Sequence, residues 1–247
     1  MNNLREAEDI LLYFGDWPLD KESRTYLLYH HRRYEFLLRR VDWIVAKIQS
    51  ESHDEAMNIL DVGPGFQTEI LRKTLPEAIV NTLGFEDTRF TPRPQDRHFQ
   101  FDLNDAQYQE RWPTVERHDL VILAEVIEHL YTYPVLVLKC ISTWLRRGGY
   151  LLVQTPNACA LHKRIRMLMG RNPYDMIRET RDNPGHFREY TIKELISIAN
   201  QSGFALIEYT TRNYFDNGTT QQKLYDALSR ILPKSLRQGV TACFRKI

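Results

Sequence analysis

Apolar residues recur every three or four positions across residues 22–48, at Tyr34, Leu37, Val41, Ile44 and Ile48. This spacing is typical of a helix that buries one face and leaves the other in water. The segment precedes the first strand-like run of the chain. We therefore expect residues 1–50 to form an N-terminal helical appendage.

From residue 58 onward, short apolar runs alternate with helical patterns. Strands are predicted at residues 58–62, 79–85, 98–101, 119–124, 150–154, 204–211 and 240–245. Helices are predicted at residues 134–145, which the arginines and glycines at 146–149 should end, and at residues 191–201. The alternation predicts an α/β fold with a doubly wound, mostly parallel sheet of seven strands, in which the last strand is antiparallel.

Two segments interrupt the alternation within a main domain at residues 51–247. Residues 158–185 are basic, carry a short helical stripe of Leu161, Ile165 and Leu168, and have no strand signal. We expect this segment to be an inserted lid. Residues 212–239 are predicted as a helical insertion whose stripe is formed by Leu224, Ala227, Leu228 and Ile231.

Composition and charge exclude several classes of protein. Of the 247 residues, 43% are hydrophobic and 11% aromatic, which is enough for a sizeable core. Lys and Arg number 33 and Asp and Glu 32, so bulk charge does not favour a nucleic-acid partner. The three cysteines lack C-x-x-C spacing, which argues against a disulfide scaffold or a cysteine zinc site. Without a signal core or a membrane-spanning run, the protein is expected to be cytoplasmic.

Three basic clusters stand out from this neutral average. They are formed by Arg32, Arg33, Arg39 and Arg40, by Lys163, Arg164, Arg166 and Arg171, and by Lys234, Arg237, Arg245 and Lys246. If they converge over a pocket, they favour an anionic ligand. Residues 221–236 could also lie on a membrane surface as a helix, so peripheral membrane contact stays open, as does the oligomeric state.

The clearest chemical signal is a strand that ends in Asp61 and continues into a turn containing Gly63 and Gly65. Glycines in such a turn let a small molecule approach the main chain at the start of a helix. Glu86 follows one strand–helix–strand unit later, where a carboxylate can accept hydrogen bonds from both ribose hydroxyls. The pattern favours a nucleoside cofactor.

With these residues, the chain resembles the class I S-adenosylmethionine-dependent methyltransferases, which have a Rossmann-like fold. Further matches are Asp102 after the predicted strand at 98–101, the string DLVILAEVIEHL at residues 119–130, Thr155 to Asn157, and Gly185 to Thr191. The last three resemble a subgroup with biosynthetic and small-RNA substrates. Gln67 departs from the family, which has a third glycine there, so the methionine end of the cofactor is expected to be held differently.

The resemblance implies a role for each matching residue. Gly63 and Gly65 would let the backbone approach the methionyl group, Glu86 would bind the ribose, and Asp102 would meet the adenine amino group. Leu103 would pack beside the base. The cofactor-binding residues are therefore predicted to be Asp61, Gly63, Gly65, Glu86, Asp102, Leu103 and Glu125.

The candidate catalytic bases are His129, which follows the fourth predicted strand, and His186. A hydroxyl acceptor benefits from a base with a pKa near neutrality, and imidazole has one. In the methyltransferases that act on the terminal ribose of small RNAs, residues resembling Glu125, Glu128, His129 and His186 bind a metal. The EVIEHL string is also similar to that of ubiquinone-type O-methyltransferases. We therefore expect a metal-independent reaction and keep the four-residue metal site as the alternative.

The predicted activity is methyl transfer from S-adenosylmethionine to oxygen on a small or lipid-linked biosynthetic metabolite. Two alternatives remain, a metal-dependent RNA ribose 2′-O-methyltransferase and a non-catalytic S-adenosylmethionine-binding scaffold. We do not expect a nucleic-acid partner, because the chain carries no recognisable RNA-binding module.

Overall fold

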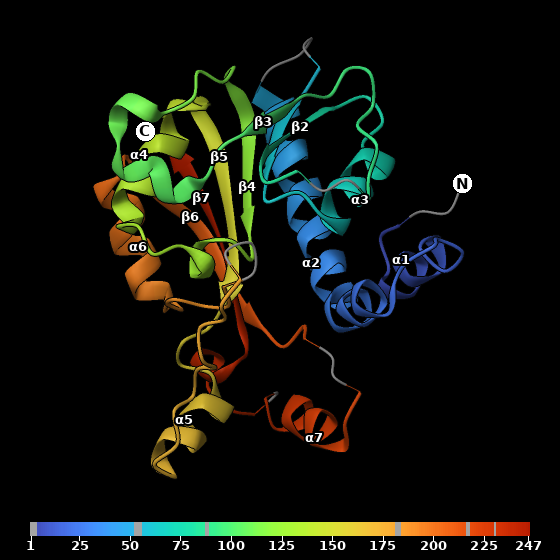
Figure 1. Ribbon diagram of the computed structural model, residues 1–247, viewed down its shortest axis with the longest axis vertical. Helices are drawn as coiled ribbons and strands as arrows, with labels where there is room; N and C mark the ends of the chain where they lie inside the picture. The colour runs from blue at the N-terminus through green and yellow to red at the C-terminus, as the bar shows by residue number, and fades with distance from the viewer. Residues whose placement is uncertain (1–3, 52–55, 87–88, 181–183, 216–217, 230) are drawn as a thin grey trace.

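A mixed sheet in the order β3-β2-β1-β4-β5-β7-β6 forms the centre of the fold (Figure 1). The computed structural model describes residues 4–51, 56–86, 89–180, 184–215, 218–229 and 231–247. The strands are β1 Asn58–Val62, β2 Ile79–Gly84, β3 His98–Gln100, β4 His118–Ala124, β5 Leu145–Pro156, β6 Phe204–Arg212 and β7 Gly239–Lys246. Strands β1 to β5 run parallel, whereas β7 is antiparallel to both β5 and β6. The predicted α/β, Rossmann-like sheet is confirmed.

Strand β5 begins earlier than the sequence predicts. Helix α4, Pro134–Thr143, ends before the arginines and glycines at 146–149, and these residues lie in the first part of β5. The pairing of β5 with β4 shifts between His118 and Leu120. A bulge therefore accommodates the polar start of the strand, and a period-two pattern does not reveal such a bulge.

Helices cover both faces of the sheet. They are α1 Ala7–Tyr13, α2 Lys21–Glu51, α3 Phe66–Thr74, α4, α5 Leu161–Leu168, α6 Ile192–Gln201 and α7 Thr220–Leu228, with short 3₁₀ turns at Leu103–Gln107, Gln109–Arg111, Ile127–His129 and Lys234–Leu236. One apolar cluster joins α1, α2 and α3 to the sheet, and another joins α4 and α6 to its opposite face. The two layers are visible on either side of the strands in Figure 1.

Helix α2 contributes directly to the core. Its apolar stripe, including Leu37, Val41 and Ile44, packs in one cluster with Ile59 of β1 and Ile122 of β4. The helix predicted at residues 22–48 is thus confirmed, and the N-terminal helical region covers the sheet. Among the described residues, no helix is both long enough and apolar enough to cross a bilayer.

Helices α5 and α7 project beyond the carboxyl ends of the strands, at the lower end of Figure 1. The stripes that the sequence predicts there are largely exposed. Leu168 of α5 is 88% exposed and Leu224 of α7 is 61% exposed. Helix α7 also ends at Leu228, so Ile231 lies beyond it. These apolar residues have little sheet surface to pack against.

Candidate active site

The turn after β1 has a backbone that requires glycine. Gly63 has φ +78°, and its N–H donates to the Leu83 carbonyl at 2.8 Å. A Cβ at this position would lie 2.7 Å from the Cγ2 methyl of Val126. A side chain here would therefore be strained and would also clash with the loop after β4. Gly63 also lines the cavity described next, where the missing side chain leaves its main chain accessible.

A cavity of about 630 Å³ lies at the carboxyl ends of β1, β2 and β4. Its lining includes Gly63, Asp102, Leu103, Glu125 and His129, all of which the sequence predicts as site residues. Asp102 also accepts a hydrogen bond from the Asn104 N–H at 2.9 Å, which caps the 3₁₀ turn that follows. Five predicted residues therefore surround one space of suitable size for a nucleoside. We call it the first cavity.

Asp61 supports the glycine turn from the interior of the protein and does not line the first cavity. Its carboxylate accepts hydrogen bonds from Gln67 Nε2 at 2.9 Å and Thr68 Oγ1 at 2.6 Å. Complete burial raises the pKa of Asp61 to about 6. Gly65, the second predicted glycine, is the N-cap of α3 and also lies outside the lining. Direct contact with a ligand is thus not shown for either residue.

Gln67 has a structural role that explains its departure from the family pattern. Its Oε1 accepts a hydrogen bond at 3.3 Å from Arg33, a residue of α2 with only 1% exposure. The same guanidinium donates to Gln154 Oε1 at 3.2 Å and to His30 Nδ1 at 3.1 Å. Gln67 thus links the first acid of the site to the N-terminal helix.

Glu86 lies at the edge of the site. It is exposed just after β2 and lines a much smaller neighbouring cavity with Pro64 and His98, while Phe85 lines the first cavity. The next carboxylate in the sequence, Asp87, is the alternative ribose ligand and lies outside the described residues. Binding of the ribose by Glu86 stays a prediction.

A second cavity of about 620 Å³ adjoins the first. Glu125, His129 and Arg178 line both, so the two spaces meet at these side chains. The second cavity is enclosed by α2, α5, α7 and the segment after α5. Its lining includes Tyr29, Lys163, Arg166, Tyr174, His186, Glu189 and Tyr225.

His129 has the hydrogen bonding that a general base needs. Its Nδ1 lies 2.8 Å from the Gly185 carbonyl, which can only accept, so Nδ1 carries the proton in the neutral ring. Nε2 therefore keeps its lone pair. Burial lowers the pKa of His129, which favours this neutral form.

His186 lies beside His129, with 4.8 Å between the ring centroids. Its Nδ1 donates to Glu189 Oε1 at 3.0 Å, and Glu189 forms an ion pair with Lys163 from α5. Burial lowers the pKa of His186 to about 4 and that of Lys163 to about 8. The sequence analysis named Lys163 only as a member of a basic cluster and did not expect Glu189 in the site, although the three-residue spacing of His186 and Glu189 is a usable signal.

Two carboxyl groups follow β4, that of the partly buried Glu125 and that of the fully buried Glu128. Glu125 has a left-handed backbone, with φ +57°, and its Oε1 is buried without a hydrogen-bond partner. Glu128 accepts from Thr155 Oγ1 at 2.9 Å through Oε2, while its buried Oε1 has no such partner and lies 4.0 Å from His129 Nε2. Burial raises the pKa of Glu125 to about 7 and that of Glu128 well above its usual range.

Three of the four residues in the alternative metal site lie together. Ligand atoms of Glu128, His129 and His186 are all within 4.8 Å of one another. Glu125 is outside this group and lines the wall between the cavities. A carboxylate and two imidazoles form a donor set that fits a divalent transition metal.

The three predicted basic clusters do not all lie around one pocket. Lys163 and Arg166 of the second cluster line the second cavity, where Arg178, which the sequence analysis did not single out, joins them. Arg33 of the first cluster is buried beside Gln67, and Arg39 pairs with Glu35 on the surface. In the third cluster, Lys246 donates to the Ser142 and Leu145 carbonyls.

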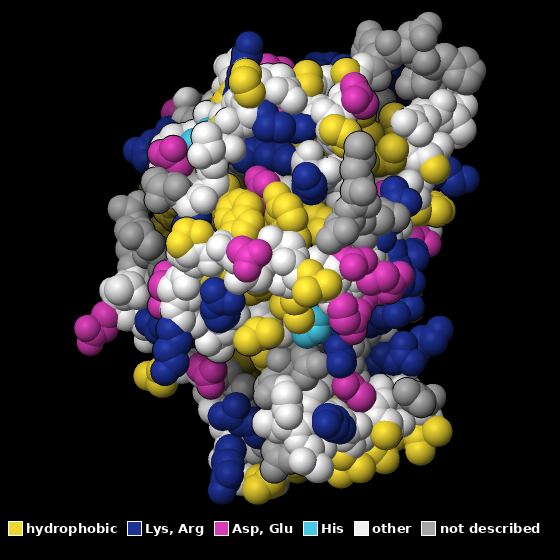
Figure 2. Space-filling model, turned by 90° about the vertical axis from the view of Figure 1, so that its right-hand side faces the viewer, with side chains coloured by type: hydrophobic (Ala, Val, Ile, Leu, Met, Phe, Trp, Pro, Cys, Tyr) yellow, Lys and Arg dark blue, Asp and Glu magenta, His cyan; other side chains and the backbone are white. Residues whose placement is uncertain are grey.

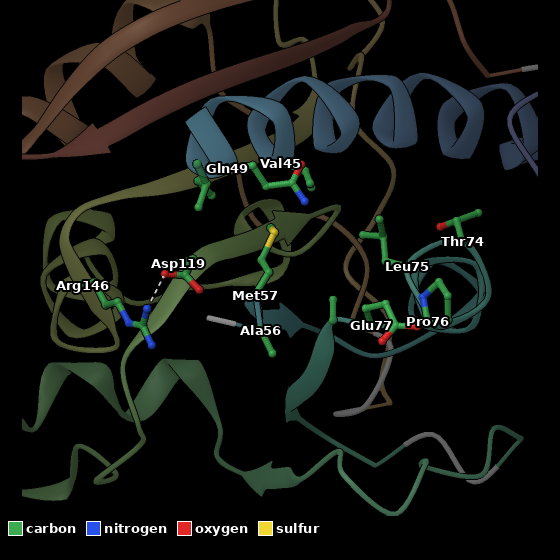
Figure 3. A pocket seen from close by; sticks show the side chains of 12 residues that line it. Val45, Gln49, Ala56, Met57, Thr74, Leu75, Pro76, Glu77, Asp119 and Arg146 are labelled. Atoms are coloured by element: carbon green, nitrogen blue, oxygen red, sulfur yellow. Dashed lines mark hydrogen bonds and ion pairs between the residues drawn. The ribbon is translucent and has the colours of Figure 1, made fainter. Parts of the chain in front are cut away.

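A further cavity, of about 300 Å³, lies at the amino ends of β1 and β4 (Figure 3). Its walls are mainly apolar, with Val45, Met57 and Leu75, and the ion pair of Arg146 with Asp119, 2.9 Å long, lies at its side. It is at the opposite end of the strands from the glycine turn. None of the predicted site residues lines it.

The sequence of residues 29–209 matches a family described as a methyltransferase domain. The chain belongs to this methyltransferase family. No curated protein matches the chain by sequence. The enzyme class and the methyl donor expected from the sequence, S-adenosylmethionine, are thereby supported. Four of the seven predicted cofactor-binding residues, Gly63, Asp102, Leu103 and Glu125, line the first cavity.

Solved structures of methyltransferases share the fold of this one. A SAM-dependent methyltransferase from Archaeoglobus fulgidus has a TM-score of 0.54 and 15% identity, over 86% of this chain and 94% of the other. An S-adenosylmethionine-dependent methyltransferase from Mesorhizobium loti has a TM-score of 0.51 and 14% identity, over 77% and 91% of the two chains. At these identities the likeness establishes the fold of the methyltransferase and leaves its substrate to be inferred from the site.

Proposed function

We propose that this methyltransferase transfers the methyl group of S-adenosylmethionine to an oxygen atom of a small or lipid-linked biosynthetic metabolite. The observation that carries the proposal is the junction of the two cavities at His129, whose Nε2 has a free lone pair. The EVIEHL resemblance to biosynthetic O-methyltransferases agrees with this acceptor class.

The first cavity suits the cofactor in shape and chemistry. Gly63 leaves the main chain open, Leu103 offers an apolar surface for a base, and Asp102 offers a carboxylate at the same wall. When bound there, S-adenosylmethionine supplies a methyl group activated by its sulfonium. The acceptor would then approach from the second cavity, on the other side of His129.

In the proposed reaction, the residues of the chain align the acceptor and remove its proton. His129 Nε2 accepts the proton of the acceptor hydroxyl as the oxygen attacks the methyl group in line. The Gly185 carbonyl stabilises the resulting imidazolium through Nδ1. Glu189 holds the neighbouring His186 with its Nε2 available to orient the acceptor.

The cations around the second cavity favour an anionic acceptor. Lys163, Arg166 and Arg178 line it together with the tyrosines Tyr29 and Tyr174. Lys163 is only 6% exposed and its charge is balanced by Glu189, so the attraction of an anion falls mainly to Arg166 and Arg178. A carboxylate or phosphate group on the acceptor fits this lining.

The proposal is tested by incubating the protein with S-adenosylmethionine labelled in the methyl group and a metabolite extract. We expect a labelled product with the parent protein and with the control His31→Gln, whose histidine lies on α2 outside both cavities. His129→Gln should label far less while still binding S-adenosylhomocysteine. A protein that binds the cofactor but labels nothing in any extract would be the scaffold of the alternative hypothesis.

The metal-dependent RNA ribose methyltransferase remains a second candidate because of one observation. Ligand atoms of Glu128, His129 and His186 lie within 4.8 Å of one another beside the junction of the cavities. A bound cation there would lower the pKa of an acceptor hydroxyl. Small RNAs with labelled S-adenosylmethionine, with and without a divalent metal, distinguish this function from the proposed one.

A further inference from the structure

Helices α5 and α7 and the segments that follow them carry an unusual concentration of exposed apolar side chains. We call residues 161–180 and 220–231, as far as they are described, the tip. Its exposed large hydrophobic residues are Ile165, Met167, Leu168, Met169, Tyr174, Met176, Ile177, Leu224, Leu228 and Ile231. Leu168 and Met176 are each 88% exposed and Ile231 is 81% exposed. Nearly half of the exposed large hydrophobic residues in the described chain thus lie in one small part of it.

The inner side of the tip is already used for packing, so its apolar residues point outward. The His162 ring of α5 contacts the Tyr225 ring of α7 with 6.2 Å between centroids, and the Tyr225 hydroxyl donates to the Leu236 carbonyl. Lys163 points inward to Glu189. The opposite sides of both helices therefore have no counterpart in the described part of the fold.

The surroundings of the exposed residues are basic. Arg164, Arg166 and Arg171 are exposed on or just after α5, and Lys223 and Lys234 are exposed on and after α7. Acidic side chains of the tip are Asp175, Glu179 and Asp226, the last of which pairs with Arg32. In Figure 2, hydrophobic side chains (yellow) follow the lower edge, with Lys and Arg side chains (dark blue) nearby.

We propose that the tip binds to the surface of an anionic phospholipid bilayer. It forms the projecting lower end of the molecule (Figure 1), where it can meet an extended, deformable surface. Exposed apolar residues beside arginines and lysines combine burial at the acyl boundary with attraction to anionic headgroups. The positive charge of the tip thus favours a membrane with negatively charged headgroups.

Docking would also bring the acceptor site close to the membrane. Ile165 and Met176 line the second cavity and are themselves exposed at the tip, 46% and 88% respectively. The cavity would then open toward the lipid surface, from which a lipid-linked anionic acceptor could enter. This consequence rests on the proposed function, whereas docking itself does not.

The test is sedimentation of the full chain with vesicles of phosphatidylcholine alone or mixed equally with phosphatidylglycerol. We expect binding to the mixed vesicles only, weakened by salt. Leu168→Ser should reduce the apparent affinity about tenfold, because a leucine is lost from the buried face. Arg171→Gln should reduce it about fivefold. The matched controls Leu12→Ser on α1 and Lys193→Gln on α6, both of which change exposed residues, should bind as the parent does.

Binding of S-adenosylhomocysteine and the thermal transition of each variant check that it is folded, since none of these residues lines the first cavity. A parent chain that ignores phosphatidylglycerol vesicles would overturn the proposal, as would equal losses in the tip and control variants. Light scattering provides a further check. A dimer that Leu168→Ser dissociates, without vesicle binding by the parent, would identify the tip as a self-association surface and refute membrane docking.

Discussion

The two cavities that meet at His129 are almost equal in volume, about 630 and 620 Å³, but they are built in different ways. The first is formed mainly by turns that follow strands. At such turns the backbone conformation restricts which residue can be present, as the positive φ of Gly63 illustrates. The second is formed by side chains from α2, α5, α7 and the segments beside them. If the proposed function holds, the fold determines where the cofactor binds, and the insertions determine which acceptor is methylated.

The segments that form the two cavities are also expected to differ in local stability. Residues at the first cavity, such as Gly63 and Leu103, are tied into the sheet and its core. Most of the side chains at residues 164–180 are exposed. Segments with few buried apolar contacts open more easily than core strands. We expect hydrogen exchange in residues 164–180 to slow when an acceptor binds.

The largest effect on the reaction rate is expected from a substitution of His129, where the two cavities meet. His129→Gln should lower kcat by about 10²- to 10⁴-fold, the range for loss of a general base. Steady-state rates with an identified acceptor measure this loss, and calorimetry with S-adenosylhomocysteine measures cofactor affinity. Unchanged kcat in a folded His129→Gln variant would assign the base to another residue, with His186 the next to test.

A smaller effect is expected where the ribose is predicted to bind. Glu86→Ala should weaken S-adenosylmethionine binding by about 1.5–3 kcal/mol, the range for hydrogen bonds to a charged group. Glu110→Ala is the control, because Glu110 is also exposed and lines neither cavity. If both variants bind the cofactor as the parent does, the ribose is held elsewhere.

Gly63→Ala tests whether the backbone turn determines the first cavity. The left-handed backbone costs an alanine about 1–2 kcal/mol, and its Cβ would also push against Val126. Gly170→Ala is the control. Gly170 also has a positive φ, +69°, but a Cβ at this position would have no atom within 4 Å. Both variants should lose stability in urea unfolding, whereas only Gly63→Ala should lose cofactor affinity. Equal cofactor binding by the two would contradict the assignment.

The pH dependence of the reaction should reflect His129. Burial lowers its pKa below 6.5, so the neutral base persists into mildly acidic solution. As pH falls below that pKa, protonation removes the base and kcat/KM should drop about tenfold per unit. The residual activity of His129→Gln should lack this acidic limb. An acidic limb centred above pH 6.5 would point to a different group.

Removal of metal is expected to leave the reaction rate unchanged, which makes it the smallest of the predicted effects. Dialysis against a chelator should leave the rate unaltered if His129 acts as the base. A rate that is abolished by chelator and restored by magnesium, manganese or cobalt would instead make Glu128, His129 and His186 metal ligands. This experiment decides between the two roles that the cluster can support.

The sequence predicts the first cavity better than the second for a physical reason. Gly63, Asp102 and His129 follow strands, and the carboxyl ends of parallel strands meet at one edge of a sheet. Strand positions can be inferred from period-two and apolar patterns, so these residues could be brought together without a structure. Their exact contacts could not be inferred. The sequence predicts that Asp61 and Gly65 bind the cofactor, but neither lines the first cavity.

Residues of the second cavity come from segments in which local patterns carry little positional information. Lys163 belongs to a basic helix, and no pattern indicates that it points inward to Glu189. Arg178 lies in a stretch without regular structure. For Arg33, which lies outside both cavities, a signal does exist, because it interrupts the apolar face of α2 beside Tyr34. A buried arginine in such a stripe indicates a polar partner in the core.

The hydrogen bonds of Arg33 to Gln67 and Gln154 have an evolutionary consequence. They join residues from α2, α3 and β5, so the N-terminal segment is not an interchangeable module. A chimera that exchanged this segment alone would leave two buried amide oxygens without their donor. In related sequences we expect positions 33, 67 and 154 to covary as a set, with a third glycine regained at position 67 where the arginine is lost.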